Sequence, residues 1–170
     1  MKTVNKIMVA VDFSDFSLPS VQYAAHLAKD VQAELLLVNV YNQREIDMLK
    51  RISIEEPRFS FEKYLEENIA DRQERLTALI DMSDCRKLDV KATGKVRRGV
   101  PYVELLKAIQ TEAPDLLVMG TKGRSNLMDT LVGSCARKMF RNSPIPVLSI
   151  AVRANKKICF VFMKFPPFLW

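Results

Sequence analysis

The sequence predicts a doubly wound α/β fold, in which helices cover both faces of a parallel sheet. Short apolar runs bounded by polar residues alternate with longer segments whose apolar residues recur at helical spacing. Continuous apolar runs are typical of strands that are buried on both faces, as in a parallel sheet. Because parallel crossovers are right-handed, the alternation of five strands with four helices places helices on both faces.

Five segments are predicted to be strands. A weaker, alternating segment at residues 88–96 supplies one of them. The other four are almost wholly apolar: residues 7–11, residues 35–38 with Val40, residues 116–119 and residues 147–152.

Four helices are predicted between these strands. The first follows Ser17, a candidate N-terminal cap, and Pro19, which suits a first helical turn. Pro114 prevents the third helix from continuing. The charged segment 42–57 lacks a clean period, and we interpret it as a surface excursion with or without a helical turn. The three later helices lie at residues 58–84, 103–109 and 134–142.

The composition is that of one cytoplasmic globular domain. The chain has 170 residues, of which 48% are hydrophobic and 27% charged, so disorder, collagen and coiled coil are disfavoured. Three widely spaced cysteines and a single histidine, His26, argue against a disulfide scaffold and against a structural zinc site. We therefore expect no metal site. The N-terminus has no recognisable targeting signal, and a cytoplasmic location is expected.

The net charge of +6 is concentrated in a C-terminal extension, residues 153–170, which holds four basic residues and no acidic one. The domain at residues 1–152 is nearly neutral, so nucleic acid is not an expected partner. The apolar segment 158–170 is too short to span a membrane, which takes roughly 20 apolar residues. We favour an extension that folds back as a strand or lies across a dimer. Docking on a membrane surface or partner, and a disordered extension, are the alternatives.

Three of the five glycines, Gly120, Gly123 and Gly133, fall within one short stretch, and Ser134 follows them. Gly120 ends a predicted strand, and Ser134 opens a predicted helix. Ligands of open α/β sheets bind beyond the carboxyl ends of the strands, and a helix N-terminus there favours phosphate. Glycine lets the backbone approach a ligand closely. These residues therefore favour a phosphate-bearing ligand over the alternative, glycines that only make turns.

Four strings resemble the ATP-binding branch of the universal stress protein family. The string GTKGRSNLMDTLVGS fits its Gly-x2-Gly-x9-Gly-Ser/Thr pattern, and KIMVAVDFSDFS is similar to its first strand and aspartate. PDLLVMGTKG and SPIPVLSI are similar to its fourth and fifth strands. The resemblance covers about residues 3–152. It implies a Rossmann-like, five-stranded parallel sheet of order 3-2-1-4-5, and ATP, with or without Mg²⁺, as the ligand.

The resemblance also implies twelve site residues. They divide by the part of the nucleotide that each would meet: Ala10, Val11 and Asp12 at the adenosine end, Val40 at the adenine, Met119, Gly120, Lys122 and Gly123 at the ribose and first phosphates, and Gly133, Ser134, Cys135 and Ala136 at the phosphate chain. Asp12 could instead cap its own turn, Lys122 could be a solvated loop residue, and Cys135 is interpreted as structural. Lys122 stands where some relatives carry histidine, and Ala136 offers no side-chain donor.

The sequence holds no recognisable catalytic set, since a Ser-His-Asp arrangement would need His26 and the only acids near the glycines are Asp12 and Asp129. We therefore expect a nucleotide-dependent regulatory protein of the stress response, with at most slow ATP hydrolysis. The alternative is an interaction protein that works through its dimer surface and apolar tail, with a vestigial nucleotide site. A homodimer through the edge strand 147–152 is expected, together with an unidentified protein partner.

Overall fold

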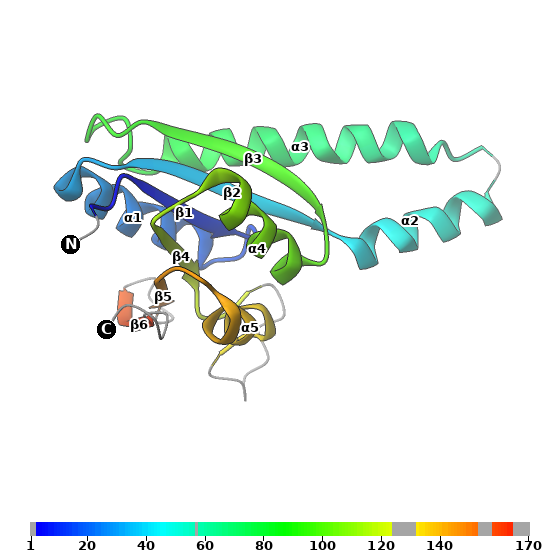
Figure 1. Cartoon of the computed structure of the whole chain (residues 1–170). Helices are drawn as coiled ribbons and strands as arrows, with labels where there is room; N and C mark the ends of the chain where they lie inside the picture. Colours follow the sequence, from blue (N-terminus) through cyan, green and yellow to red (C-terminus); the bar gives the residue numbers. More distant parts are fainter. Residues whose placement is uncertain (1–2, 57, 124–131, 153–157, 165–170) are drawn as a thin grey trace.

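A computed structural model describes residues 3–56, 58–123, 132–152 and 158–164 (Figure 1). They form one six-stranded sheet of order β3-β2-β1-β4-β5-β6. Strands β1 to β5 are parallel, which confirms the predicted five-stranded order, and β6 runs antiparallel to β5. The strands are β1 (Lys6–Val11), β2 (Glu34–Asn42), β3 (Ala92–Gly99), β4 (Leu116–Gly120), β5 (Val147–Val152) and β6 (Ile158–Lys164).

Helices cover both faces of the sheet. Alternate residues of β1 enter different cores: Ile7 and Val9 pack with α1 and α3, whereas Met8 packs with α4 and α5. This alternation explains why the strand is apolar throughout. The helices are α1 (Ser17–Val31), α2 (Gln43–Glu55), α3 (Phe61–Met82), α4 (Pro101–Glu112) and α5 (Ser134–Asn142).

The predicted cap of α1 is wrong. Phe16 is the N-cap residue, and Ser17 is the first residue of the helix. The Ser17 hydroxyl donates a hydrogen bond to Asp12 instead of to the helix backbone. Helix α4 follows the prediction more closely, because Pro101 lies in its first turn and the helix ends in a left-handed Ala113 directly before Pro114.

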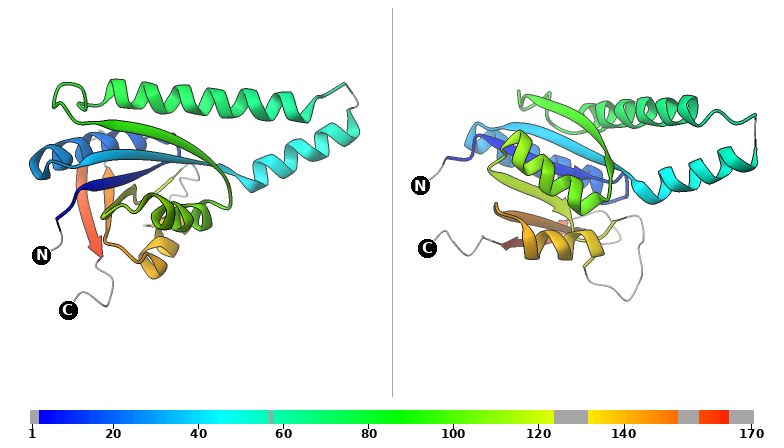
Figure 2. Two further views of the ribbon diagram at one scale, coloured as in Figure 1. Left: turned by 45° about the horizontal axis from the view of Figure 1, so that its top comes forward. Right: turned by 45° about the vertical axis from the view of Figure 1, so that its right-hand side comes forward.

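The segment predicted to be a surface excursion is a full helix, α2. Within it only Ile46 is buried, while Met48 and Ile54 are exposed, so its apolar residues do not follow one buried face. The Asn42 side chain caps it by accepting a hydrogen bond from the Arg44 backbone N–H. With α3 it forms a hairpin that projects beyond the carboxyl end of β2 (Figure 2).

The C-terminal extension contributes β6, so one of the interpretations we favoured, a strand that folds back, is what the structure holds. Ile150 pairs with Val161 and Leu148 with Met163 along the antiparallel ladder. The expectation that the 147–152 strand is a free edge is therefore wrong, because β6 covers it. None of the described helices combines the length and the apolar character needed to cross a membrane.

Candidate functional site

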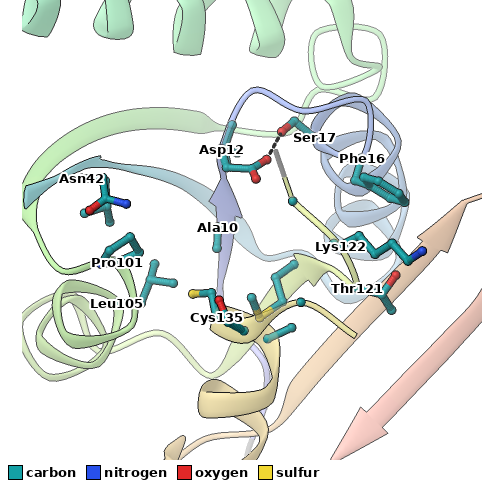
Figure 3. A pocket seen from close by; sticks show the side chains of 18 of the residues that line it. Ala10, Asp12, Phe16, Ser17, Asn42, Pro101, Leu105, Thr121, Lys122 and Cys135 are labelled. Carbon is teal, nitrogen blue, oxygen red and sulfur yellow. Dashed lines mark hydrogen bonds between the residues drawn. The ribbon is translucent and has the colours of Figure 1, made fainter. Parts of the chain in front are cut away.

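A pocket of about 510 Å³ lies at the carboxyl ends of β1, β2 and β4 (Figure 3). Strands β1 and β4 are neighbours there, and the chain continues outward from them in opposite directions. This is the switch point at which α/β sheets bind ligands. The structure brings all twelve residues of the resemblance to the wall of this pocket. Residues 124–131, inside the glycine motif, lie outside the described part of the chain.

The turn after β1 holds Asp12 in a fixed orientation. Its Oδ1 accepts hydrogen bonds from the Ser14 backbone N–H at 3.1 Å, the Ser14 hydroxyl at 2.6 Å and the Ser17 hydroxyl at 3.3 Å. Phe13 between them is left-handed, with φ 62°. Asp12 thus organises its own turn and also lines the pocket, so the two interpretations of this residue are compatible.

Two of the motif glycines are required by the packing of the protein itself. A Cβ at Gly120 would lie 2.8 Å from the Phe16 Cβ and 2.9 Å from the Lys122 carbonyl oxygen. A Cβ at Gly123 would collide with the Asp12 carboxylate. Gly120 therefore needs no ligand to explain it, and a side chain at Gly123 would displace the Asp12 carboxylate from its position.

Gly133 differs from the other two glycines. Its backbone N–H donates to the Thr121 carbonyl at 2.7 Å, which closes the loop onto β4. Among the described residues, the atom nearest to a Cβ at Gly133 would be the Thr121 carbonyl oxygen at 3.4 Å, an ordinary contact. The described part of the chain thus does not require glycine here, and a glycine also lets a ligand approach the backbone closely.

Helix α5 presents its N-terminus to the pocket. Gly133 is the N-cap residue and provides no side-chain cap, and Ser134 and Cys135 follow in the first turn. The N–H groups of that turn lack helical carbonyl partners, and the helix dipole makes this end positive. Such an end favours an anionic group such as phosphate.

Lys122 lines the pocket, but Figure 3 shows its side chain extending away from Asp12 and Cys135. The preceding residue, Thr121, is buried and bonds the Ile150 carbonyl through both its N–H and its hydroxyl, at 2.9 and 3.3 Å. The backbone before Lys122 is therefore fixed. A phosphate contact would require the lysine side chain to rotate.

Cys135 has a protonated thiol at neutral pH. Burial and, to a smaller extent, the negative charge of Asp12 raise its pKa to about 11, and Lys138 only partly opposes them. Desolvation thus outweighs the effect of the helix N-terminus, which lowers thiol pKa values. The structural interpretation of Cys135 agrees with this environment.

We expect alkylation of Cys135 by iodoacetamide at pH 8 to be about a hundredfold slower in the folded protein than in the unfolded chain, because thiolate is the reactive form. The rate should rise as the pH approaches 11. Folding favours the thiol, so this residue's contribution to stability is present below pH 9 and lost as the pH rises toward 11. Peptide mass spectrometry measures the rate for Cys135 alone. Equal rates in the folded and unfolded chains would contradict this assignment.

Eight pocket residues escaped the sequence analysis. Asn42 and Arg44 follow a predicted strand, so the rule on carboxyl ends could have found them. Pro101 and Leu105 come from α4, and only tertiary packing brings them to the pocket. The eight are Phe16, Ser17, Val38, Asn42, Arg44, Pro101, Leu105 and Thr121.

His26 lies away from the pocket, where its Nε2 is 3.2 Å from Asp84 Oδ2. Its contact lowers the pKa of Asp84, with a smaller effect from Lys87. The sequence analysis missed this carboxylate because it is 58 positions away in the chain. Among the described residues, no three His, Cys, Asp or Glu side chains lie close enough together to hold a metal ion.

A doubly wound sheet with a glycine-lined pocket at its switch point defines a Rossmann-like α/β protein. The sequence model of the universal stress protein family matches residues 3–151. The chain belongs to that family.

Curated relatives support this assignment. Universal stress protein MJ0531 of Methanocaldococcus jannaschii is 30% identical over 145 residues, which cover 85% of this chain and 81% of that protein. Universal stress protein YxiE of Bacillus subtilis is 29% identical over 153 residues, which cover 86% and 98%.

Solved structures share the fold. The structure of MJ0577 from M. jannaschii has a TM-score of 0.70 at 20% identity and covers 90% of this chain and 99% of its own. A universal stress protein in complex with cAMP has a TM-score of 0.63 at 21% identity, and the match covers 88% of this chain and 98% of that one. One from Archaeoglobus fulgidus in complex with dAMP has a TM-score of 0.59 at 17% identity, with 87% and 98% covered.

Proposed function

We propose that this universal stress protein binds ATP and acts as a nucleotide-dependent regulatory protein in the cytoplasmic stress response. The single observation that carries the proposal is the pocket, because all twelve motif residues line it together. The complexes of structural neighbours with cAMP and dAMP support an adenine nucleotide as the ligand class.

The two ends of the pocket fit the two ends of a nucleotide. Val40 and Leu105 offer apolar surface from β2 and α4, which suits a base. The backbone N–H groups of the α5 N-terminus, beginning beyond Gly133, suit the phosphates. Asp12, oriented by Ser14 and Ser17, lies between them directly after β1 and suits a ribose hydroxyl.

Regulation by binding is a better fit than efficient catalysis. Asp12 contributes the only carboxylate among the described residues that line the pocket, and two hydroxyls already bond its Oδ1. A Mg²⁺ ion would be held mostly by the phosphates, with Asp12 as the nearest protein donor. Such a site supports at most slow ATP hydrolysis.

Calorimetric titration with ATP and Mg²⁺ tests the proposal, after chromatography has shown that no nucleotide copurifies. Saturable binding in the micromolar range is expected. An empty protein that binds neither ATP nor cAMP nor dAMP would contradict it. Phosphate release, measured with and without Mg²⁺, distinguishes a slow ATPase from a protein that only binds.

The second candidate is an interaction protein that works through its tail and dimer surface, with a vestigial nucleotide site. The observation in its favour is β6, which extends the sheet beyond the part of the chain that the family matches. A homodimer through residues 147–152 would require β6 to leave β5. A protein partner, or a membrane surface, could then meet the released strand.

A further inference from the structure

Helix α2 begins at the edge of the pocket. Asn42, the last residue of β2, accepts a hydrogen bond from the Arg44 backbone N–H at 3.1 Å and so caps the helix. Both residues line the pocket. The first turn of α2 is therefore part of the pocket wall, and it brings an arginine side chain there.

Arg44 lies on the side of the pocket away from the glycines. Strand β1 separates β2, which leads into Arg44, from β4, which leads into Gly120 and Gly123. Neighbouring strands are about 4.8 Å apart, so the ends of β2 and β4 are separated by roughly 10 Å. The Gly133 N–H bonds the Thr121 carbonyl, which keeps the α5 N-terminus on the β4 side. Arg44 is thus at the base end of the proposed nucleotide site.

A buried arginine on the opposite face of the sheet holds α2 in place. The Arg72 side chain of α3 is 11% exposed, donates to Glu45 Oε2 of α2 at 2.6 Å, and lies over the Tyr41 ring at 4.1 Å. It also donates to Asn39 Oδ1 at 3.1 Å. A buried charge is costly unless it is paired, so this arrangement favours one position of α2.

The same network reaches the strand that carries the pocket. Asn39 is buried, and its Nδ2 donates to the Val11 carbonyl at 2.8 Å. Val11 lines the pocket and directly precedes Asp12. Ile46 is the one fully buried residue of α2, and the contact between Glu45 and Arg72 adds a second attachment of the helix to the sheet and α3. The network therefore fixes α2 relative to β1 and β2.

We propose that Arg44 stacks its guanidinium on the base of the bound nucleotide, and that Arg72 is the positioning residue that holds α2 for this contact. The planar guanidinium suits the face of an aromatic base. The inference rests on the proposed nucleotide binding and adds a base contact from outside the glycine motif.

Titration of Arg44→Ala with three probes, ATP, adenosine and inorganic triphosphate, tests the contact. Loss of a stacked guanidinium should lower the affinity for adenosine and for ATP by the same factor, about tenfold. The affinity for triphosphate should stay unchanged. A loss for ATP without a loss for adenosine would place Arg44 on the phosphates and overturn the proposal. Unchanged affinity for ATP and adenosine would also overturn it. A wild-type protein that binds neither nucleotide would instead contradict the proposed function.

A double-mutant cycle tests the positioning role. Arg72→Met and the milder Glu45→Gln should each lower the affinity for adenosine. In the Arg44→Ala background, neither should lower that affinity further. Full additivity would show that Arg72 only stabilises the fold and would overturn its assignment. Lys95→Met is the matched control, because it removes a 2.8 Å ion pair with Glu112, and neither residue is among the described residues that line the pocket. It should leave the affinity for adenosine unchanged.

Discussion

Gly133→Val is expected to lower the affinity for ATP by at least about a hundredfold, or about 2.7 kcal/mol, while the protein stays folded. The described residues leave an ordinary contact distance for a Cβ at Gly133, so we expect the fold to persist when this position carries a side chain. The same side chain would lie between the α5 N-terminus and a bound phosphate and prevent their hydrogen bonds. Calorimetry gives the affinity, and thermal unfolding shows whether the fold is intact.

Gly94→Ala is the matched control for this experiment. A Cβ at Gly94 would lie 2.9 Å from the Leu76 Cβ, far along β3 from the pocket, so this variant should lower the melting temperature. It should still bind ATP. Normal ATP affinity in Gly133→Val would contradict a phosphate site at α5, and a similar loss in both variants would show that binding follows stability alone.

Removal of residues 153–170 is expected to increase the self-association of the protein through β5. In the full chain β6 pairs along β5 from Val147 to Val152. Truncation exposes the backbone N–H and C=O groups of β5, an apolar strand that then becomes an edge able to pair with a second copy. Size-exclusion chromatography with light scattering over a dilution series measures the mass.

Val161→Pro in the full chain is a finer version of the same test. Proline removes one backbone donor from β6 and disfavours a strand at that position, opposite Ile150. It should shift the protein part of the way toward self-association and leave ATP binding unchanged. A full-length protein that is already a stable dimer, or a truncated one that stays monomeric at all concentrations, would contradict the role of β6 as the cover of β5.

Local sequence patterns were sufficient to predict the strands of the central sheet and the glycines of the motif at residues 120–134. The apolar runs predicted β1, β2, β4 and β5 because strands buried on both faces need apolar residues on both sides. The α5 range, residues 134–142, was predicted at both ends. Helix α2 was missed because the exposed apolar residues Met48 and Ile54 obscure the helical spacing of Ile46, Leu49 and Ile52.

The sequence by itself determined the fold class, because that depends on short-range apolar patterns. The strand order and the twelve residues that line the pocket followed from the family resemblance, which rests on short strings of sequence. Only the tertiary structure decided which glycines the packing requires, that β6 covers β5, and that Pro101 and Leu105 of α4 join the pocket wall. It also decided that Arg72 reaches Asn39 and Glu45, residues 33 and 27 positions away. Such contacts depend on how helices pack on the sheet, and no local spacing along the chain encodes them.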